Sequence, residues 1–144
     1  MKISTRGRYA TRMLLDLAQH LGGGYVALKD IAERQDISKK YLEQIIPLLR
    51  KAGILHTTRG FQGGYMLAKQ PGDITMGEIL RVTEGSLAPV ACLEDESGVV
   101  CVRSADCPTL PVWVGLQKVM SEYLDGITLE DLMTQTGHGD DYVI

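Results

Sequence analysis

The chain has 144 residues, of which 44% are hydrophobic, as expected for one domain that buries a core. No apolar run approaches the ~20 residues that cross a bilayer, and the basic first residues are not followed by an apolar signal segment. These features argue against a membrane or secreted protein. We therefore expect a cytoplasmic protein whose three cysteines are thiols or metal ligands rather than disulfides.

Charge divides the chain into two halves. Residues 1–69 hold twelve Lys or Arg and five Asp or Glu, a net charge of +7. Residues 70–144 hold three Lys or Arg and thirteen Asp or Glu, a net charge of −10. The basic half suits a polyanion such as nucleic acid. Solvated surface charge is common, so this asymmetry indicates nucleic-acid binding only together with a binding motif.

The first predicted helix begins at Ser4, an N-cap residue, and ends at the glycines of residues 22–24. Positive charge near a helix N-terminus opposes the helix dipole. The arginines there are therefore expected to serve DNA phosphate or, as the simpler alternative, solubility. The apolar face of this helix has a period of 3.6 and consists of Tyr9, Met13, Leu17 and Leu21.

The next stretch has the pattern helix, turn, helix. A short helix is expected over residues 28–34 and a turn over 35–37, after which Ser38 caps a longer helix. The buried face of that longer helix is formed by Leu42, Ile45, Ile46 and Leu49. In helix-turn-helix proteins the N-terminal residues of the second helix meet base edges in the major groove. The residues placed toward DNA are Ser38, Lys39, Lys40, Tyr41 and Gln44.

The chemistry of these side chains predicts different roles. Gln44 can read adenine through paired hydrogen bonds. Lys39 and Lys40 are expected to bind phosphate, which positions the protein without specifying sequence.

A glycine-rich hairpin follows directly. Strands are expected at residues 54–58 and 65–68, joined by the turn Arg59-Gly60-Phe61-Gln62-Gly63-Gly64. An arginine at the tip suits a narrow minor groove, and Gly60 allows close backbone approach. An ordinary surface hairpin is the alternative, but the position after a helix-turn-helix favours a wing. The turn is not a nucleotide loop because it lacks Gly-Lys-Ser/Thr.

The acidic half begins with a helix over residues 76–83, for which Thr75 is the cap and Glu78 its reciprocal partner. Residues 86–108 then form a polar, acidic loop, and loops of this length are uncommon unless functional. This loop holds all three cysteines, Cys92, Cys101 and Cys107.

A long helix is predicted from Thr109. It carries two apolar stripes, more than one small domain needs, so we expect one side to pack on its own core and the other on a second subunit. Dimer symmetry would then require palindromic half-sites in the DNA. Thr128 caps a short last helix, and residues 137–144 are expected to form a loose tail.

The stretches KISTRGRYATRMLLDLA, IAERQDISKKYLEQIIPLLRKAGI, RGFQGGYMLA and ITMGEILRVTEG, with the cysteine loop, resemble the Rrf2 family. This is the IscR/NsrR/CymR group of bacterial winged-helix regulators, and the resemblance covers nearly the whole chain. It implies a mostly α fold with a small β-hairpin: a winged helix-turn-helix domain at 1–85, a cysteine-bearing sensor loop at 86–108, and a dimerisation helix with a C-terminal tail at 109–144. It also implies a homodimer on double-stranded DNA. The DNA-binding residues that it carries over are Ser38, Lys39, Tyr41, Gln44, Arg59 and Gly60, with Arg8 near the backbone.

The resemblance further implies an iron–sulfur cluster, two-iron or four-iron, because many members hold one with three cysteines in this loop. Cys92, Cys101 and Cys107 would be its ligands, and several thiolates suit such a soft centre. The spacing departs from the pattern, since the eight residues between the first two cysteines exceed those of the cluster-binding relatives. Leu110 and Arg8 stand where relatives place a fourth ligand. Redox-sensing thiols, a zinc site and cysteines without a role are the alternatives.

The expected function is therefore a sequence-specific transcriptional regulator, a repressor, controlled by an iron–sulfur cluster. The alternative keeps the same fold and senses through thiols, a metabolite or a partner enzyme. A cysteine or zinc enzyme is disfavoured because no histidine lies near the cysteine loop and no metallohydrolase motif is present. We predict no catalytic residues.

Overall fold

The computed structural model describes residues 2–61, 63–94 and 101–136. The predicted tail from residue 137 and part of the predicted cysteine loop, residues 95–100, lie outside these ranges. The described chain is mostly helical with one two-stranded antiparallel hairpin, which confirms the predicted fold class. None of its helices is both long and apolar enough to cross a membrane. The elements are α1 (Thr5–Gln19), α2 (Leu28–Gln35), α3 (Lys39–Lys51), β1 (Leu55–Thr58), β2 (Gly64–Leu67), α4 (Met76–Glu84), α5 (Leu110–Asp125) and α6 (Leu129–Thr136).

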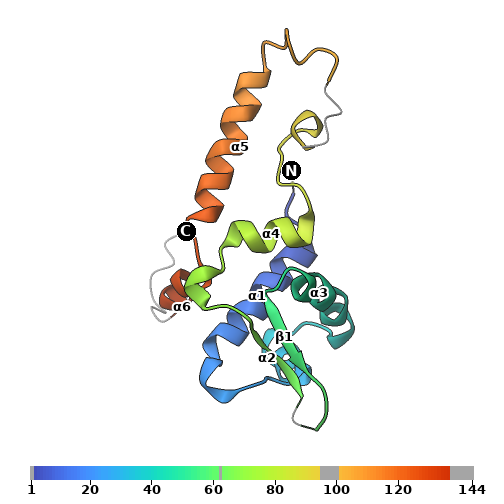
Figure 1. Cartoon of the computed structure of the whole chain (residues 1–144), viewed down its shortest axis with the longest axis vertical. Coiled ribbons are helices and arrows are strands. Elements are labelled where there is room, and N and C mark those ends of the chain that lie inside the picture. Colours follow the sequence, from blue (N-terminus) through green and yellow to red (C-terminus); the bar gives the residue numbers. More distant parts are fainter. Residues whose placement is uncertain (1, 62, 95–100, 137–144) are drawn as a thin grey trace.

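Helix α1 is the centre of the hydrophobic core, and α2, α3, α4, α6 and the hairpin surround it (Figure 1). Apart from Tyr9 and Leu21, the side chains of the predicted apolar faces of α1 and α3 are buried, each contributing about 1.5–3 kcal/mol relative to exposure. Tyr9 is partly buried. Leu21 is 42% exposed, because α1 ends at Gln19 and a 3-10 turn at Leu21–Gly23 leads the chain away. Leu129 shows that α6 shares the same core.

The beginning of α1 is attached to the end of α4. Ser4 is the N-cap, and its Oγ accepts a hydrogen bond from the Gly7 N–H at 3.4 Å. The Ser4 N–H and Oγ–H both donate to Glu84 Oε1, at 2.9 and 2.7 Å. Gly7 permits this approach, because a Cβ there would collide with the Glu84 carboxylate.

The hairpin is attached near its turn to the segment before α2. Leu55 lies opposite Leu67, and Thr58 lies opposite Gly64. On the other edge of β2, the N–H groups of Val26 and Tyr65 each donate to the other residue's carbonyl, both at 2.8 Å. Gly64 borders this contact. A Cβ at that position would overlap the Val26 carbonyl, so the approach depends on the glycine.

The caps of α4 and α6 differ from prediction in one respect. Thr75 Oγ1 accepts from the Glu78 N–H at 3.1 Å, as predicted. The Glu78 carboxylate, however, pairs with the Lys69 ammonium group instead of completing the capping box. The reciprocal box is found in α6, where the Asp131 N–H donates to Thr128 Oγ1 and the Thr128 N–H donates to Asp131 Oδ2.

Helix α5 projects away from the body of the molecule (Figure 1). It packs mainly against α4, and Arg81 of that helix forms two hydrogen bonds, at 2.7 and 2.9 Å, with the Asp125 carboxylate. No residue of α5 is buried. Its large exposed apolar side chains are Val112, Val114, Leu116, Val119 and Tyr123.

The close contact between Gly64 and the Val26 backbone makes a direct prediction. Gly64→Ala should lower the free energy of unfolding by about 1–3 kcal/mol, because the new Cβ must push the Val26 backbone away. Thermal unfolding measures this. Gly22→Ala is the matched control and should cause no loss, since nothing lies within 4 Å of its Cβ position. Equal stability of the two variants would contradict the assigned contact.

Candidate nucleic-acid interface

The turn between α2 and α3 has the geometry that the sequence predicts. Asp36 ends α2 in the left-handed region, with φ 52° and ψ 49°, a conformation that Asp adopts at low cost. Ile37 is buried, and its N–H donates to the Ala32 carbonyl at 3.1 Å. Ser38 Oγ accepts from the Tyr41 N–H at 3.1 Å, so α3 begins directly after the turn. Residues 28–51 thus form a helix-turn-helix.

The predicted DNA-facing residues gather at the beginning of α3. Ser38, Lys39, Lys40 and Gln44 are exposed there. Tyr41 is half-buried, because its ring packs edge-on against Tyr9 of α1, with centroids 5.3 Å apart. Only the outer part of Tyr41 is available to a ligand.

The hairpin tip lies beside this surface. Arg59 and Gly60 are exposed, and Gly60 has a φ of 107°. A cleft of about 330 Å³ separates the hairpin from the helix-turn-helix, and its lining includes Lys29, Lys39 and Gly60. Lys29, in the first turn of α2, is a further basic group that sequence reasoning missed, since no pattern distinguishes it from a solvated surface lysine. Arg8 is exposed on the first turn of α1 and does not line this cleft.

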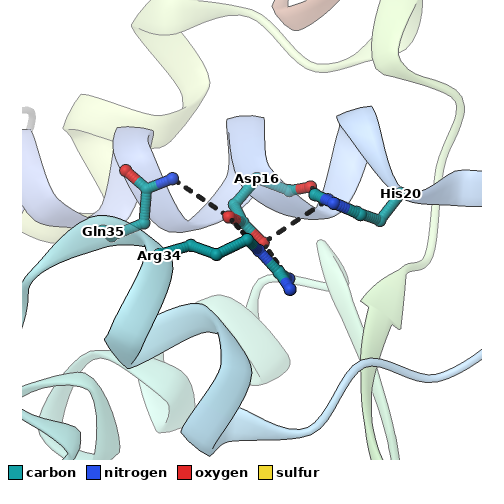
Figure 2. Close-up of polar contacts among 4 residues, drawn as sticks. All are labelled: Asp16, His20, Arg34 and Gln35. Atoms are coloured by element: carbon teal, nitrogen blue, oxygen red, sulfur yellow. Dashed lines mark hydrogen bonds and ion pairs between the residues drawn. The ribbon is translucent and has the colours of Figure 1, made fainter.

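A buried carboxylate connects α1 to the helix-turn-helix (Figure 2). Asp16 is 1% exposed. Arg34 Nε and Nη2 donate to its two oxygens at 3.0 and 2.7 Å, and Gln35 Nε2 donates to Oδ2 at 3.0 Å. His20 Nδ1 lies 2.6 Å from the Asp16 carbonyl oxygen and 3.7 Å from Oδ1. Arg34 and Gln35 are the last two residues of α2, so this cluster determines where α2 ends relative to α1.

Burial raises the pKa of Asp16, but hydrogen bonds from Arg34 and Gln35 and the charge of Arg34 outweigh burial and hold it below its ordinary value of 3.8. The carboxylate is therefore ionised wherever the protein is folded near neutral pH.

Arg12 adds a second connection at the same place. Its Nε donates to Gln35 Oε1 at 3.3 Å, its Nη2 contacts the Gln35 carbonyl, and its guanidinium lies 5.4 Å from the Tyr9 ring centroid. Sequence reasoning did not identify either connection. The available signal was a charged residue, Asp16, within the largely apolar run of residues 13–18.

The three cysteines are free thiols, and all lie in the segment between α4 and α5. Cys92 and Cys101 are exposed, and Cys107 is half-buried. Cys107 Sγ lies 3.4 Å from Thr109 Oγ1, and this hydrogen bond lowers the pKa of the Cys107 thiol. Within residues 2–61, 63–94 and 101–136, no three Cys, His, Asp or Glu side chains lie close enough to share a metal ion. The donor chemistry suits iron, but the structure does not gather the three predicted ligands.

The start of the cysteine loop is fixed to the body. Leu87 and Ala88 are buried, and the Ala88 N–H donates to Ser86 Oγ at 3.0 Å. These residues directly follow Glu84, which holds Ser4 at the beginning of α1. The cysteine loop and the basic end of α1 are therefore joined through a short, ordered path.

The Asp16 cluster predicts a pH dependence of stability. Because the folded pKa of Asp16 lies below 3.8, its contribution is complete above that pH and is lost as the pH falls below about 4. Asp16→Asn should remove roughly 1.5–3 kcal/mol at neutral pH and flatten the decline in stability between pH 4 and the folded pKa. Chemical denaturation at several pH values measures both effects.

The matched control is Asp125→Asn. This residue also has a lowered pKa, through its hydrogen bonds with Arg81, but the pair is exposed, and its removal should change stability by at most about 1 kcal/mol. An equal loss of stability from the two substitutions would show that burial does not increase the contribution of Asp16.

Known proteins are similar to this one over nearly the whole chain. The family model described as "Rrf2: Iron-dependent Transcriptional regulator" matches residues 3–135. The protein Rrf2 of Nitratidesulfovibrio vulgaris is 48% identical over 133 residues, covering 92% of this chain and 87% of that protein. The solved structure of CymR, the global cysteine regulator of B. subtilis, is 41% identical with a TM-score of 0.75, covering 94% of this chain and 98% of that one. That of T. potens IscR is 42% identical with a TM-score of 0.73, covering 98% and 92%.

Proposed function

The chain belongs to the Rrf2 family of transcriptional regulators, and we propose that it acts as a repressor that binds palindromic DNA as a homodimer. Its relatives are DNA-binding regulators and not enzymes. The observation that carries the proposal is the shared surface of α3 and the hairpin. Exposed lysines and an amide at the beginning of α3 lie beside a cleft bordered by the glycine-rich hairpin.

In this proposal the beginning of α3 enters the major groove. Gln44 reads a base edge, Ser38 and the exposed part of Tyr41 contact the groove, and Lys39 and Lys40 contact phosphate. The hairpin is the wing, with Arg59 and Gly60 at the minor groove. Lys29 contributes a further phosphate contact from the cleft, and Arg8 approaches the backbone from α1.

The second subunit packs on α5. This helix has five large exposed apolar side chains and no buried residue, an arrangement that is unfavourable in a monomer. Pairing two copies would bury these side chains and relate the two copies of α3 by a two-fold axis. The chain then divides by role into the DNA-binding residues 1–85, the sensor loop 86–108 and the dimer-forming residues 109–144.

We further propose that an iron–sulfur cluster held by Cys92, Cys101 and Cys107 controls DNA binding. Three free thiols, one with a lowered pKa, supply the ligand chemistry, and the matching family model is described as iron-dependent. A bound cluster would supply a redox-sensitive centre. The protein connects the cysteine loop to the rest of the fold at both ends. Before the loop, Glu84 is bonded to Ser4 of α1, and after it, Thr109 bonds Cys107 just before α5. A coupling of about 1–3 kcal/mol would suffice.

The second candidate is a regulator of the same fold that senses through its thiols. Two observations favour it: the cysteines are not gathered among the described residues, and the hydrogen bond from Thr109 favours the reactive thiolate of Cys107. Two exposed thiols in the same loop then offer partners for oxidation.

Substitutions can distinguish the residues that read the DNA sequence from those that only position the protein on DNA. With an operator obtained by in vitro selection, Gln44→Ala should relax the preference at one base pair by about 1–3 kcal/mol and leave the salt dependence unchanged. Lys39→Ala should weaken binding to all sequences and reduce the slope of log K against log salt by about 1. Uniform weakening by Gln44→Ala would contradict its assignment to readout.

Purification without oxygen decides between the two sensors. A cluster-controlled protein should contain iron, absorb in the visible range, and lose both with Cys101→Ala, with a change in operator affinity of roughly 5- to 150-fold. A colourless protein without iron, whose affinity changes on thiol oxidation and no longer does so in Cys107→Ala, would replace the cluster by the thiol mechanism. Equal operator affinity in every state would contradict both.

A further inference from the structure

The tip of the wing carries a fully exposed aromatic ring. Phe61 has a relative exposure of 104%, and it is the one phenylalanine in the sequence. Burying such a ring is stabilising, so its complete exposure forgoes that stabilisation in the free protein. The other exposed large apolar residues of the DNA-binding half, Leu21 and Tyr25, are 42% and 40% exposed. Phe61 is therefore the most exposed apolar group near the proposed interface.

The backbone around Phe61 raises the ring away from the body. Gly60, with a φ of 107°, precedes it, and Gly63 turns the chain back, its N–H donating to the Gly60 carbonyl at 2.9 Å. A Cβ on Gly63 would collide with backbone of Thr58 and Gly60, so the tip is narrow and closely turned. A narrow loop with a ring at its end can enter a groove that a broad element cannot.

The charge around the ring indicates which partner it meets. Arg59 is exposed two positions before Phe61. The charged residues that line the cleft on the α3 side of the wing are Lys29, Lys39 and Glu43, so the cations outnumber the one carboxylate. The partner must accept both cations and an apolar ring, and it must be narrow enough for the tip to enter. The minor groove of duplex DNA meets these requirements. Its phosphates attract the cations, and its base steps present apolar stacking faces once they are opened.

We propose that Phe61 inserts into the minor groove as an apolar wedge that partly unstacks one base step. This inference rests on the proposed entry of the wing into that groove and goes beyond it. Because opening a step costs least at pyrimidine–purine steps, the operator should carry TA or CA/TG where the wing tip lies. Phe61 thus contributes sequence preference through DNA deformability, whereas Gln44 reads base edges.

The test compares the full chain with Phe61→Ala and Phe61→Leu on a selected operator. Phe61→Ala should weaken binding roughly 5- to 150-fold, as loss of one stacking contact does. The salt dependence should not change, because no charge is removed. Phe61→Leu should retain part of the affinity, and Arg59→Ala is the contrast, since it should change the salt dependence. Selection with Phe61→Ala should lose the preference for a flexible step at the wing position.

A base analogue reports the insertion itself. With 2-aminopurine at the wing step, the wild-type chain should raise fluorescence on binding and Phe61→Ala should not. Unchanged affinity in Phe61→Ala, or no fluorescence response in the wild type, would overturn the wedge while leaving the proposed function intact. A lower melting temperature of Phe61→Ala without DNA would also overturn it, by showing that the ring packs on the neighbouring cleft lined by His20 and Tyr25. Failure of the wild-type chain to select any DNA would instead reject the proposed function.

Discussion

The orientation of α2, and with it the start of α3, depends on one buried carboxylate. Asp16 lies in the apolar core of α1, where an ionised group is costly unless its oxygens are hydrogen-bonded. Arg34 and Gln35 provide three hydrogen bonds from the last turn of α2. Because the bonds are directional, they restrict both the distance and the rotation of that turn in a way that hydrophobic packing does not. The turn at Asp36 and the start of α3 follow immediately, so α3 inherits this orientation.

The same helix supports the other parts of the proposed interface. The wing is connected near its turn to Val26, two residues before α2. At its other end α1 is held by Glu84, the last residue of α4. Helix α1 is thus bonded to α2 through Asp16 near its C-terminal end and to α4 through Ser4 at its beginning, and Tyr9 between them packs on Tyr41 of α3 (Figure 1). A displacement of α4 has a physical route to the proposed DNA-binding surface.

The sequence predicted those features that local patterns determine. The caps at Ser4, Ser38 and Thr75 and the buried face of α3 depend on residues within one or two turns, and each is present. The partners of Asp16 lie 18 and 19 residues away, beyond any helical period, and Glu78 bonds Lys69 rather than Thr75 because a charged partner was within reach. In the candidate site, the sequence was enough to predict which side chains of α3 face outward. The arrangement of the three thiols depends on the conformation of a loop, which no periodicity encodes.

The contact between α1 and α4 is weak enough to be broken by a regulatory signal. The two hydrogen bonds from Ser4 to the Glu84 carboxylate are exposed, so together they contribute on the order of 1 kcal/mol. Allosteric coupling in proteins is typically about 1–3 kcal/mol, so making or breaking this one contact is sufficient to change DNA affinity measurably. Opening the Asp16 cluster would instead leave an ionised carboxylate buried without its partners, which costs about 3–5 kcal/mol and exceeds that range. A signal at the cysteines is therefore expected to move the α1–α4 contact and the start of α5, while the helix-turn-helix moves as a rigid unit.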